Sequence, residues 1–150
     1  MRILIQRVKK ASVTIDNILK SEIGAGLLVL VGIEDSDNDK DSLWLASKLV
    51  KMRIFNDENG MMNLSVLDFD GEIMVVSQFT LHALTNKGNR PSYIKAARPE
   101  KAIPLYNHFC NEIEILMNKK VKTGEFGADM QVELINDGPV TIWMDSKENV

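Results

Sequence analysis

The segment Leu27-Leu-Val-Leu-Val31 decides the fold class, because it is continuously apolar and contains β-branched valines. Such a run is typical of a strand that is covered on both faces. A second strand is predicted over Glu72 to Thr80, and its residues Ile73-Met-Val-Val76 are expected to be buried on both sides as well. The two runs predict a sheet whose centre is enclosed by other elements.

Shorter strands are predicted on both sides of these runs. In each of them apolar and polar residues alternate, or turn residues separate one apolar stretch from the next. Near the N-terminus these are a strand at Ala11 to Ile15, a turn at Asp16-Asn17 and a hairpin partner at Ile18 to Ile23; near the C-terminus they are a strand at Met130 to Leu134, a turn at Asn136 to Pro139 and a last strand at Val140 to Met144.

Two amphipathic helices complete the pattern. The first carries apolar residues at helical spacing from Leu45 to Met52, and the second spans about Pro99 to Lys119 or starts just after Pro104. This order predicts one α/β domain over residues 1–150 with a mixed sheet. Because two helices cannot cover both faces of so many strands, we expect either two packed β layers with the helices outside, or a barrel-like sheet that shares a face with a partner chain.

Charge and composition limit the classes of function. The net charge of −3 argues against a protein that coats nucleic acid without sequence preference, since such binding needs a broad positive surface. The stretch from Lys87 to Lys101 is an exception with a net charge of +4. It is interpreted either as a small basic footprint for an RNA end or as a solvated loop.

Location and cofactors are predicted from what the chain lacks. No apolar run approaches the roughly 20 residues that span a bilayer, and the start MRILIQRVKK does not resemble a signal peptide, so a cytoplasmic protein is expected. Cys110 is the only cysteine and is interpreted as a small buried hydrophobe. His82 and His108 show no metal-ligand spacing, and no nucleotide-binding glycine motif occurs, so neither a metal nor a cofactor is predicted.

The segment Ser77-Gln-Phe-Thr80 is the first candidate for chemistry, because it stands where a buried strand enters a polar loop. Its hydroxyls and amide must find hydrogen bonds there, so a purely structural capping role is the alternative. A Ser-His-acid triad is disfavoured, since His82 is the only nearby histidine and is expected to be a loop residue.

The segment Asn136-Asp-Gly-Pro139 reads by itself as a turn between two strands. Pro139 cannot donate a backbone hydrogen bond. If the bond before it were cis, the carbonyl oxygens of Gly138 and Pro139 would form a fixed pair of acceptors able to hold an ammonium group. The residues alone do not decide whether this happens.

Together these segments resemble the D-aminoacyl-tRNA deacylase family along essentially the whole chain. Four motifs occur in family-like order and spacing, and the opening Gln6-Arg-Val8 is also similar. The motifs are Ser77-Gln-Phe-Thr-Leu81, Lys87-Gly-Asn-Arg-Pro-Ser92, Thr123-Gly-Glu-Phe-Gly-Ala-Asp-Met130 and Asn136-Asp-Gly-Pro-Val-Thr141.

The resemblance implies a homodimer without cofactor that hydrolyses the ester of D-aminoacyl-tRNA. It further implies that a cis Gly138-Pro139 pair reaches into the partner's active site and grips the substrate ammonium with its carbonyls. An L side chain would then meet the Gly-Pro backbone and be excluded, which is selection by clash. Glycine, having no side chain, would be accepted, so mischarged glycyl-tRNA is a second expected substrate.

The remaining site residues are mapped in the same way. Ser77, Gln78, Phe79 and Thr80 are the candidate catalytic residues, and Phe79 with Phe126, Gly127, Ala128 and Met130 would line the adenosine pocket. Thr80 lacks an evident base, so water or the terminal 2′-hydroxyl is the expected nucleophile. Arg7 is expected to brace the Gly-Pro loop or to be a surface charge. The alternatives for function are a noncatalytic RNA-binding dimer and a general ester hydrolase with Ser77 as nucleophile.

Overall fold

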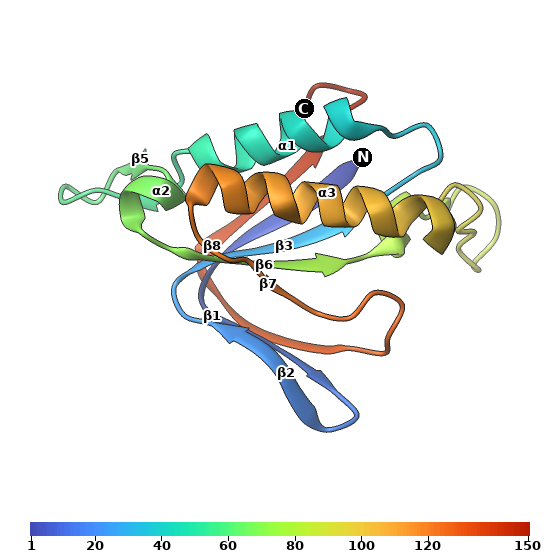
Figure 1. The fold of residues 1–150 in the computed structure, drawn as a ribbon, viewed down its shortest axis with the longest axis horizontal. Helices are drawn as coiled ribbons and strands as arrows, with labels where there is room; N and C mark the ends of the chain where they lie inside the picture. The colour runs from blue at the N-terminus through green and yellow to red at the C-terminus, as the bar shows by residue number, and fades with distance from the viewer.

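The two apolar runs form adjacent strands in the middle of a six-stranded mixed sheet (Figure 1). β3 (Gly26–Gly32) and β6 (Glu72–Ser77) pair in parallel, with Leu27 beside Ile73 and Val31 beside Ser77. These relations come from a computed structural model that describes all 150 residues.

Both faces of these strands are covered, as the sequence predicts. On one face, side chains such as Val29 and Val75 join the main core under α1 (Asp39–Lys51) and α3 (Pro99–Met117). Alternate residues such as Met74 join a second core on the other face. Figure 1 shows α1 and α3 side by side on one side of the sheet. Neither these helices nor any other is long and apolar enough to cross a membrane.

The sheet curls until its ends nearly meet. β1 (Arg2–Ile15) pairs antiparallel with β3 through its first half, with β2 (Ile18–Ile23) through its second half, and with β8 (Gln131–Asp145) along its other edge. β7 (Lys122–Thr123) adds to β6, and its Thr123 carbonyl accepts a hydrogen bond of 2.7 Å from the Ser21 hydroxyl of β2. This arrangement confirms the barrel-like alternative with two main helices outside.

Among the short elements that were not predicted from the sequence, three lie close together. They lie between α1 and β6 and are β4 (Phe55–Asn56), β5 (Met62–Leu64) and α2 (Val66–Phe69).

The predicted strand from Glu72 to Thr80 is too long. β6 ends at Ser77, and the Gln78 N–H makes the last bond toward β3, to the Val31 carbonyl at 2.7 Å. The Gln78 carbonyl then accepts from Leu81, so the chain turns into the 3₁₀ helix η1 (Phe79–His82). The turn aims the segment after Ser77 out of the sheet.

The predicted turn from Asn136 to Pro139 is wrong in a similar way, because β8 runs through it. Asn136 pairs with Val8 and Thr141 pairs with Gln6, so residues 137–140 bulge opposite Arg7 alone. The Asn136 amide nitrogen donates to the carbonyls of Arg7 at 3.0 Å and Val140 at 2.9 Å, which closes the bulge. Because these bonds satisfy the backbone locally, the ladder resumes after four unpaired residues.

The second helix begins at Pro99 and continues through Pro104, so the prediction of a start after Pro104 is wrong. The apolar face already begins with the buried Ala102, before the inner proline. Cys110 is buried in this helix, and burial raises the pKa of its thiol to about 12, which agrees with the interpretation as a buried hydrophobe.

Candidate active site

A small pocket lies where β6 gives way to η1. Ser77, Gln78 and Phe79 form one wall of it, and Phe126 joins them from the loop after β7. Apolar side chains supply most of the remaining lining, namely Val31, Ile33, Ala97 and Ala102. The structure therefore brings together three of the four predicted catalytic residues and one predicted pocket residue.

The pocket has a volume of about 30 Å³. A cavity of this size holds roughly one or two water-sized groups. Any larger group must therefore lie across its mouth, where the Phe79 side chain is 56% exposed.

Thr80 lies beside the pocket and does not line it. Its hydroxyl oxygen accepts a hydrogen bond from the Gln78 amide nitrogen at 2.5 Å. Neither Thr80 nor Ser77 is hydrogen-bonded to a carboxylate or an imidazole, so neither hydroxyl has a general base beside it. Nowhere in the chain do three His, Cys, Asp or Glu side chains converge on a possible metal site.

The other residues of the predicted adenosine wall are placed differently from Phe126. Gly127 lies in a turn with φ of +80°, and its position faces open space. Neither Gly127 nor Ala128 lines the pocket, and the Met130 side chain packs against the second core. Of this segment, only Phe126 lines the pocket.

The bulge of β8 presents Gly138 and Pro139, whose peptide bond is cis. Arg7 holds the bulge from β1: its Nε donates to the Asp137 carbonyl at 3.1 Å, and its Nη1 donates to the Ile54 carbonyl at 2.6 Å. The Arg7 side chain also lies 3.5 Å from the Asp137 carboxylate. Arg7 is only 6% exposed, so the alternative of a surface charge is wrong.

The bulge and the pocket lie far apart within one chain. Arg7, opposite the bulge, pairs with Leu27, and Leu27 pairs with Ile73 near the start of β6. Ser77 stands four residues further along β6, which is roughly 13 Å along the strand. Three strand spacings, roughly 14 Å, separate β8 from β6 across the sheet. Gly138 and Pro139 therefore do not reach the pocket within the same chain.

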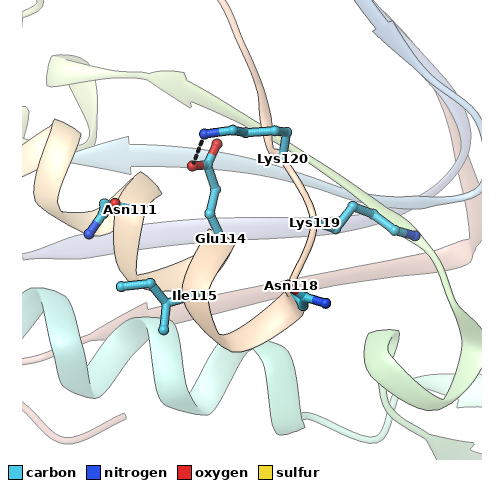
Figure 2. A pocket seen from close by; sticks show the side chains of 6 residues that line it. All are labelled: Asn111, Glu114, Ile115, Asn118, Lys119 and Lys120. Atoms are coloured by element: carbon cyan, nitrogen blue, oxygen red, sulfur yellow. Dashed lines mark hydrogen bonds and ion pairs between the residues drawn. The ribbon is translucent and has the colours of Figure 1, made fainter.

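A second, more open hollow lies at the C-terminal end of α3 and contains none of the predicted site residues. Figure 2 shows that its lining comes from the last turns of the helix and the lysines that follow. Lys120 forms an ion pair of 3.0 Å with Glu114 there. The hollow has only one hydrophobic residue, Ile115, and we place the active site at the β6 pocket instead.

Similar proteins identify the family of this chain. Residues 4–145 match a family model described as D-Tyr-tRNA(Tyr) deacylase. The chain belongs to this deacylase family. A D-aminoacyl-tRNA deacylase of Bacteroides fragilis is 63% identical over 147 residues, and one of Flavobacterium psychrophilum is 65% identical over the same length. In both cases 98% of each chain is covered.

Two solved structures share the fold of this chain. One described as a c-Myc DNA unwinding element binding protein is 40% identical, with a TM-score of 0.90 over 97% of this chain and 98% of its own. A probable eukaryotic D-amino acid tRNA deacylase shares the fold, with a TM-score of 0.82 at 17% identity over 95% of this chain and 97% of its own. The prediction of a hydrolase of the D-aminoacyl-tRNA deacylase class is confirmed by this membership.

Several residues around the β6 pocket were not predicted. Ala97 and Ala102 line it without carrying any chemical signal in the sequence. Tyr106 supports it from behind: its hydroxyl donates to the Val75 carbonyl at 2.7 Å, and its ring packs edge-on against Phe126. The sequence carries no signal for the hydrogen bond of the Tyr106 hydroxyl.

His82 ends η1 and is not the loop residue that the sequence predicts. It is 1% exposed, and neither ring nitrogen has a hydrogen-bond partner. Burial lowers the pKa of this imidazole below its ordinary value, and the nearby Arg2 guanidinium lowers it further, while the adjacent Gly32 backbone and Glu34 act in the opposite direction. The folded state therefore favours the neutral form of the His82 ring.

Acid is expected to destabilise the protein through His82. Because the folded state binds this proton less readily than the unfolded chain, the stabilisation is complete above about pH 6.5 and falls as the pH drops below it. A single such proton contributes at most about 1.4 kcal/mol per pH unit. Thermal unfolding at pH 7.5 and 5.5 should show a smaller pH dependence in His82→Leu than in the wild type. An unchanged dependence would assign the acid sensitivity to other groups.

Proposed function

We propose that this protein hydrolyses the ester bond of D-aminoacyl-tRNA, releasing the amino acid and free tRNA. The observation that carries the proposal is the convergence of Ser77, Gln78, Phe79 and Phe126 on one pocket in a chain of this family. A substrate of this kind would be met in the cytoplasm. Its ester would enter the pocket, and its terminal adenosine would rest against the exposed ring of Phe79.

We further propose that the active unit is a homodimer in which each chain completes the other's site. Support comes from the separation of the bulge and the pocket within one protomer. Support also comes from β8, a strand of 15 residues that pairs only with β1 and leaves its other edge free. A long free edge is a surface on which another chain can pack. Ile135 and Trp143 on this strand are partly exposed apolar side chains.

In this dimer the carbonyls of Gly138 and Pro139 would accept hydrogen bonds from the substrate ammonium. With the ammonium and the ester fixed, an L side chain would point into the Gly-Pro backbone, and a D side chain would point into open space. Discrimination then rests on a clash with backbone atoms. Glycyl esters would pass the same filter, because glycine has no side chain to exclude.

Catalysis in this proposal comes mainly from positioning. Backbone N–H groups of the Ser77–Thr80 segment and the Ser77 hydroxyl would hold the ester carbonyl as negative charge develops on it. Water would attack the carbonyl, either directly or after the 2′-hydroxyl of the terminal adenosine has taken over the acyl group. In both routes the C–O bond to the ribose oxygen breaks, that oxygen takes a proton from the attacking water, and the free amino acid leaves. Because no base stands beside Ser77 or Thr80, fixing the reactants would supply much of the rate enhancement.

Incubation with D-Tyr-tRNA and L-Tyr-tRNA tests the proposal. We expect release of tyrosine from the D ester alone. Binding of both without release would favour a noncatalytic RNA-binding dimer. Activity on simple esters, with labelling of Ser77 by a serine-reactive phosphonate, would favour a general ester hydrolase.

Thr80→Ala is expected to keep kcat/KM for D-Tyr-tRNA within about tenfold of the wild type. Removal of a true nucleophile costs about 10⁴-fold or more, whereas here only a hydrogen-bonded hydroxyl is lost. Single-turnover kinetics, with tRNA binding and the thermal midpoint as controls, measures the difference. If turnover vanished while binding and folding stayed intact, Thr80 would be the nucleophile.

A further inference from the structure

A basic loop stands next to the pocket. Leu84 and Ser92 exchange two backbone hydrogen bonds, of 2.8 and 2.9 Å, and so close residues 85–91 into a loop. The loop carries Lys87 and Arg90, both exposed. In Figure 1 it projects beyond the arrowhead of β6, at the end of the molecule where η1 lies.

The cations of this segment have no role within the fold. Three more follow the loop, namely Lys95, Arg98 and Lys101, and none of the five side chains forms a hydrogen bond or an ion pair. Other unpaired lysines are scattered over the surface of this chain of net charge −3. Residues 1–15 also carry a net charge of +4, but Arg2 and Arg7 there form ion pairs with Asp145 and Asp137, whereas all five cations of the stretch from Lys87 to Lys101 are unpaired. The charge is thus concentrated at one place and free to meet an anion.

Aromatic side chains connect this segment to the pocket. The ring of Tyr93 packs edge-on against Phe79, with 5.1 Å between centroids. Both rings are partly open to solvent, with Phe79 56% and Tyr93 40% exposed. Phe79 and Ala97 line the pocket, so the segment forms part of the pocket's rim.

We propose that Lys87, Arg90 and the Phe79–Tyr93 pair form a docking surface for the single-stranded 3′ end of an RNA. The cations would bind phosphates upstream of the terminal nucleotide, and the exposed rings would stack on a base. The inference rests on the proposed function, which supplies the RNA. The pocket's size supports it as well, since a volume of about 30 Å³ leaves every nucleotide outside.

The test compares two double variants with the same change in net charge. Lys87→Ala/Arg90→Ala removes the proposed phosphate contacts, and Lys119→Ala/Lys120→Ala removes two lysines at the remote hollow of Figure 2, where both have acidic partners. Each is assayed on D-Tyr-tRNA between about 50 and 200 mM NaCl, a range over which phosphate contacts lose most of their strength. Each is also assayed on a D-tyrosyl-adenosine ester, which has no upstream phosphate.

For Lys87→Ala/Arg90→Ala we expect kcat/KM on D-Tyr-tRNA to fall on the order of tenfold. The slope of its logarithm against log salt should become shallower by roughly 1.4 for two lost contacts. Activity on the adenosine ester should be unchanged, and the remote variant should match the wild type on both substrates. Tyr93→Leu should lower activity on the tRNA several-fold, as loss of one stacked base predicts.

Two results would overturn the docking surface. One is wild-type activity of Lys87→Ala/Arg90→Ala on D-Tyr-tRNA at every salt concentration. The other is an equal loss on both substrates, which would place these residues in the reaction itself. If the wild-type protein cleaved neither substrate, the proposed function would fail, and binding of uncharged tRNA in the same salt series would still decide the docking surface.

Discussion

Gly138→Ala should lower kcat/KM for D-Tyr-tRNA by about 100-fold or more, because displacement of a positioning group by about 1 Å has an effect of this size. Gly138 has a φ of +123°, a conformation that L residues rarely adopt. An added Cβ would lie 2.7 Å from Arg7 Nη2 and 3.1 Å from Val140 Cγ2. Since Arg7 holds the bulge in place, the clash would move the two carbonyls that are proposed to bind the ammonium.

The measurement is single-turnover deacylation, with Gly60→Ala as the matched control. Gly60 also has a positive φ, of +76°, but no atom lies within 4 Å of its added Cβ. That variant also places an L residue at a positive φ, and it lies on the turn between β4 and β5, away from the pocket and the bulge. Wild-type kcat/KM in Gly138→Ala, with the fold intact, would refute the role assigned to the bulge.

The fold could be predicted from the sequence where hydrophobic patterning is strong. The runs around Val29 and Val75 are apolar at every position because both faces of β3 and β6 are buried, and they were placed correctly. What the patterning could not reveal is where the hydrogen bonding changes. The end of β6 at Ser77 depends on the backbone bonds of Gln78, and the continuity of β8 through the bulge depends on two bonds made by the Asn136 side chain.

The site shows the same division. Ser77, Gln78 and Phe79 stand out in the sequence as polar and aromatic groups at a strand end, and they do line the pocket. Ala97 and Ala102 line it only because tertiary folding brings them there. The inward orientation of His82 also has no local signal, since it follows from the close packing of η1 on Gly32, where an added Cβ would lie 3.0 Å from the ring.

That close packing has a counterpart at the other end of β3, where Gly26→Ala is expected to have the largest effect on stability. The added Cβ would overlap the carbonyl oxygen of Glu72 and lie 2.7 Å from its carbonyl carbon and its nitrogen. All three are backbone atoms, so no rotamer change can relieve the contact. Overpacking of this kind costs about 3 kcal/mol or more.

For a chain of this length, a loss of about 3 kcal/mol lowers the thermal midpoint by roughly 6–12 °C. Gly24→Ala is the matched control two residues away, since its added Cβ would meet only the Glu72 side chain, at 3.9 Å. Thermal unfolding of both variants measures the difference, and equal midpoints would show that the two strands can separate without cost.

Gly26→Ala is also expected to lower activity. Gly26 pairs with Glu72 in the same ladder that ends at Val31 and Ser77, so any shift between β3 and β6 also displaces these two residues, which line the pocket. Folded Gly26→Ala should therefore lose deacylation in parallel with stability, whereas Gly24→Ala should keep both.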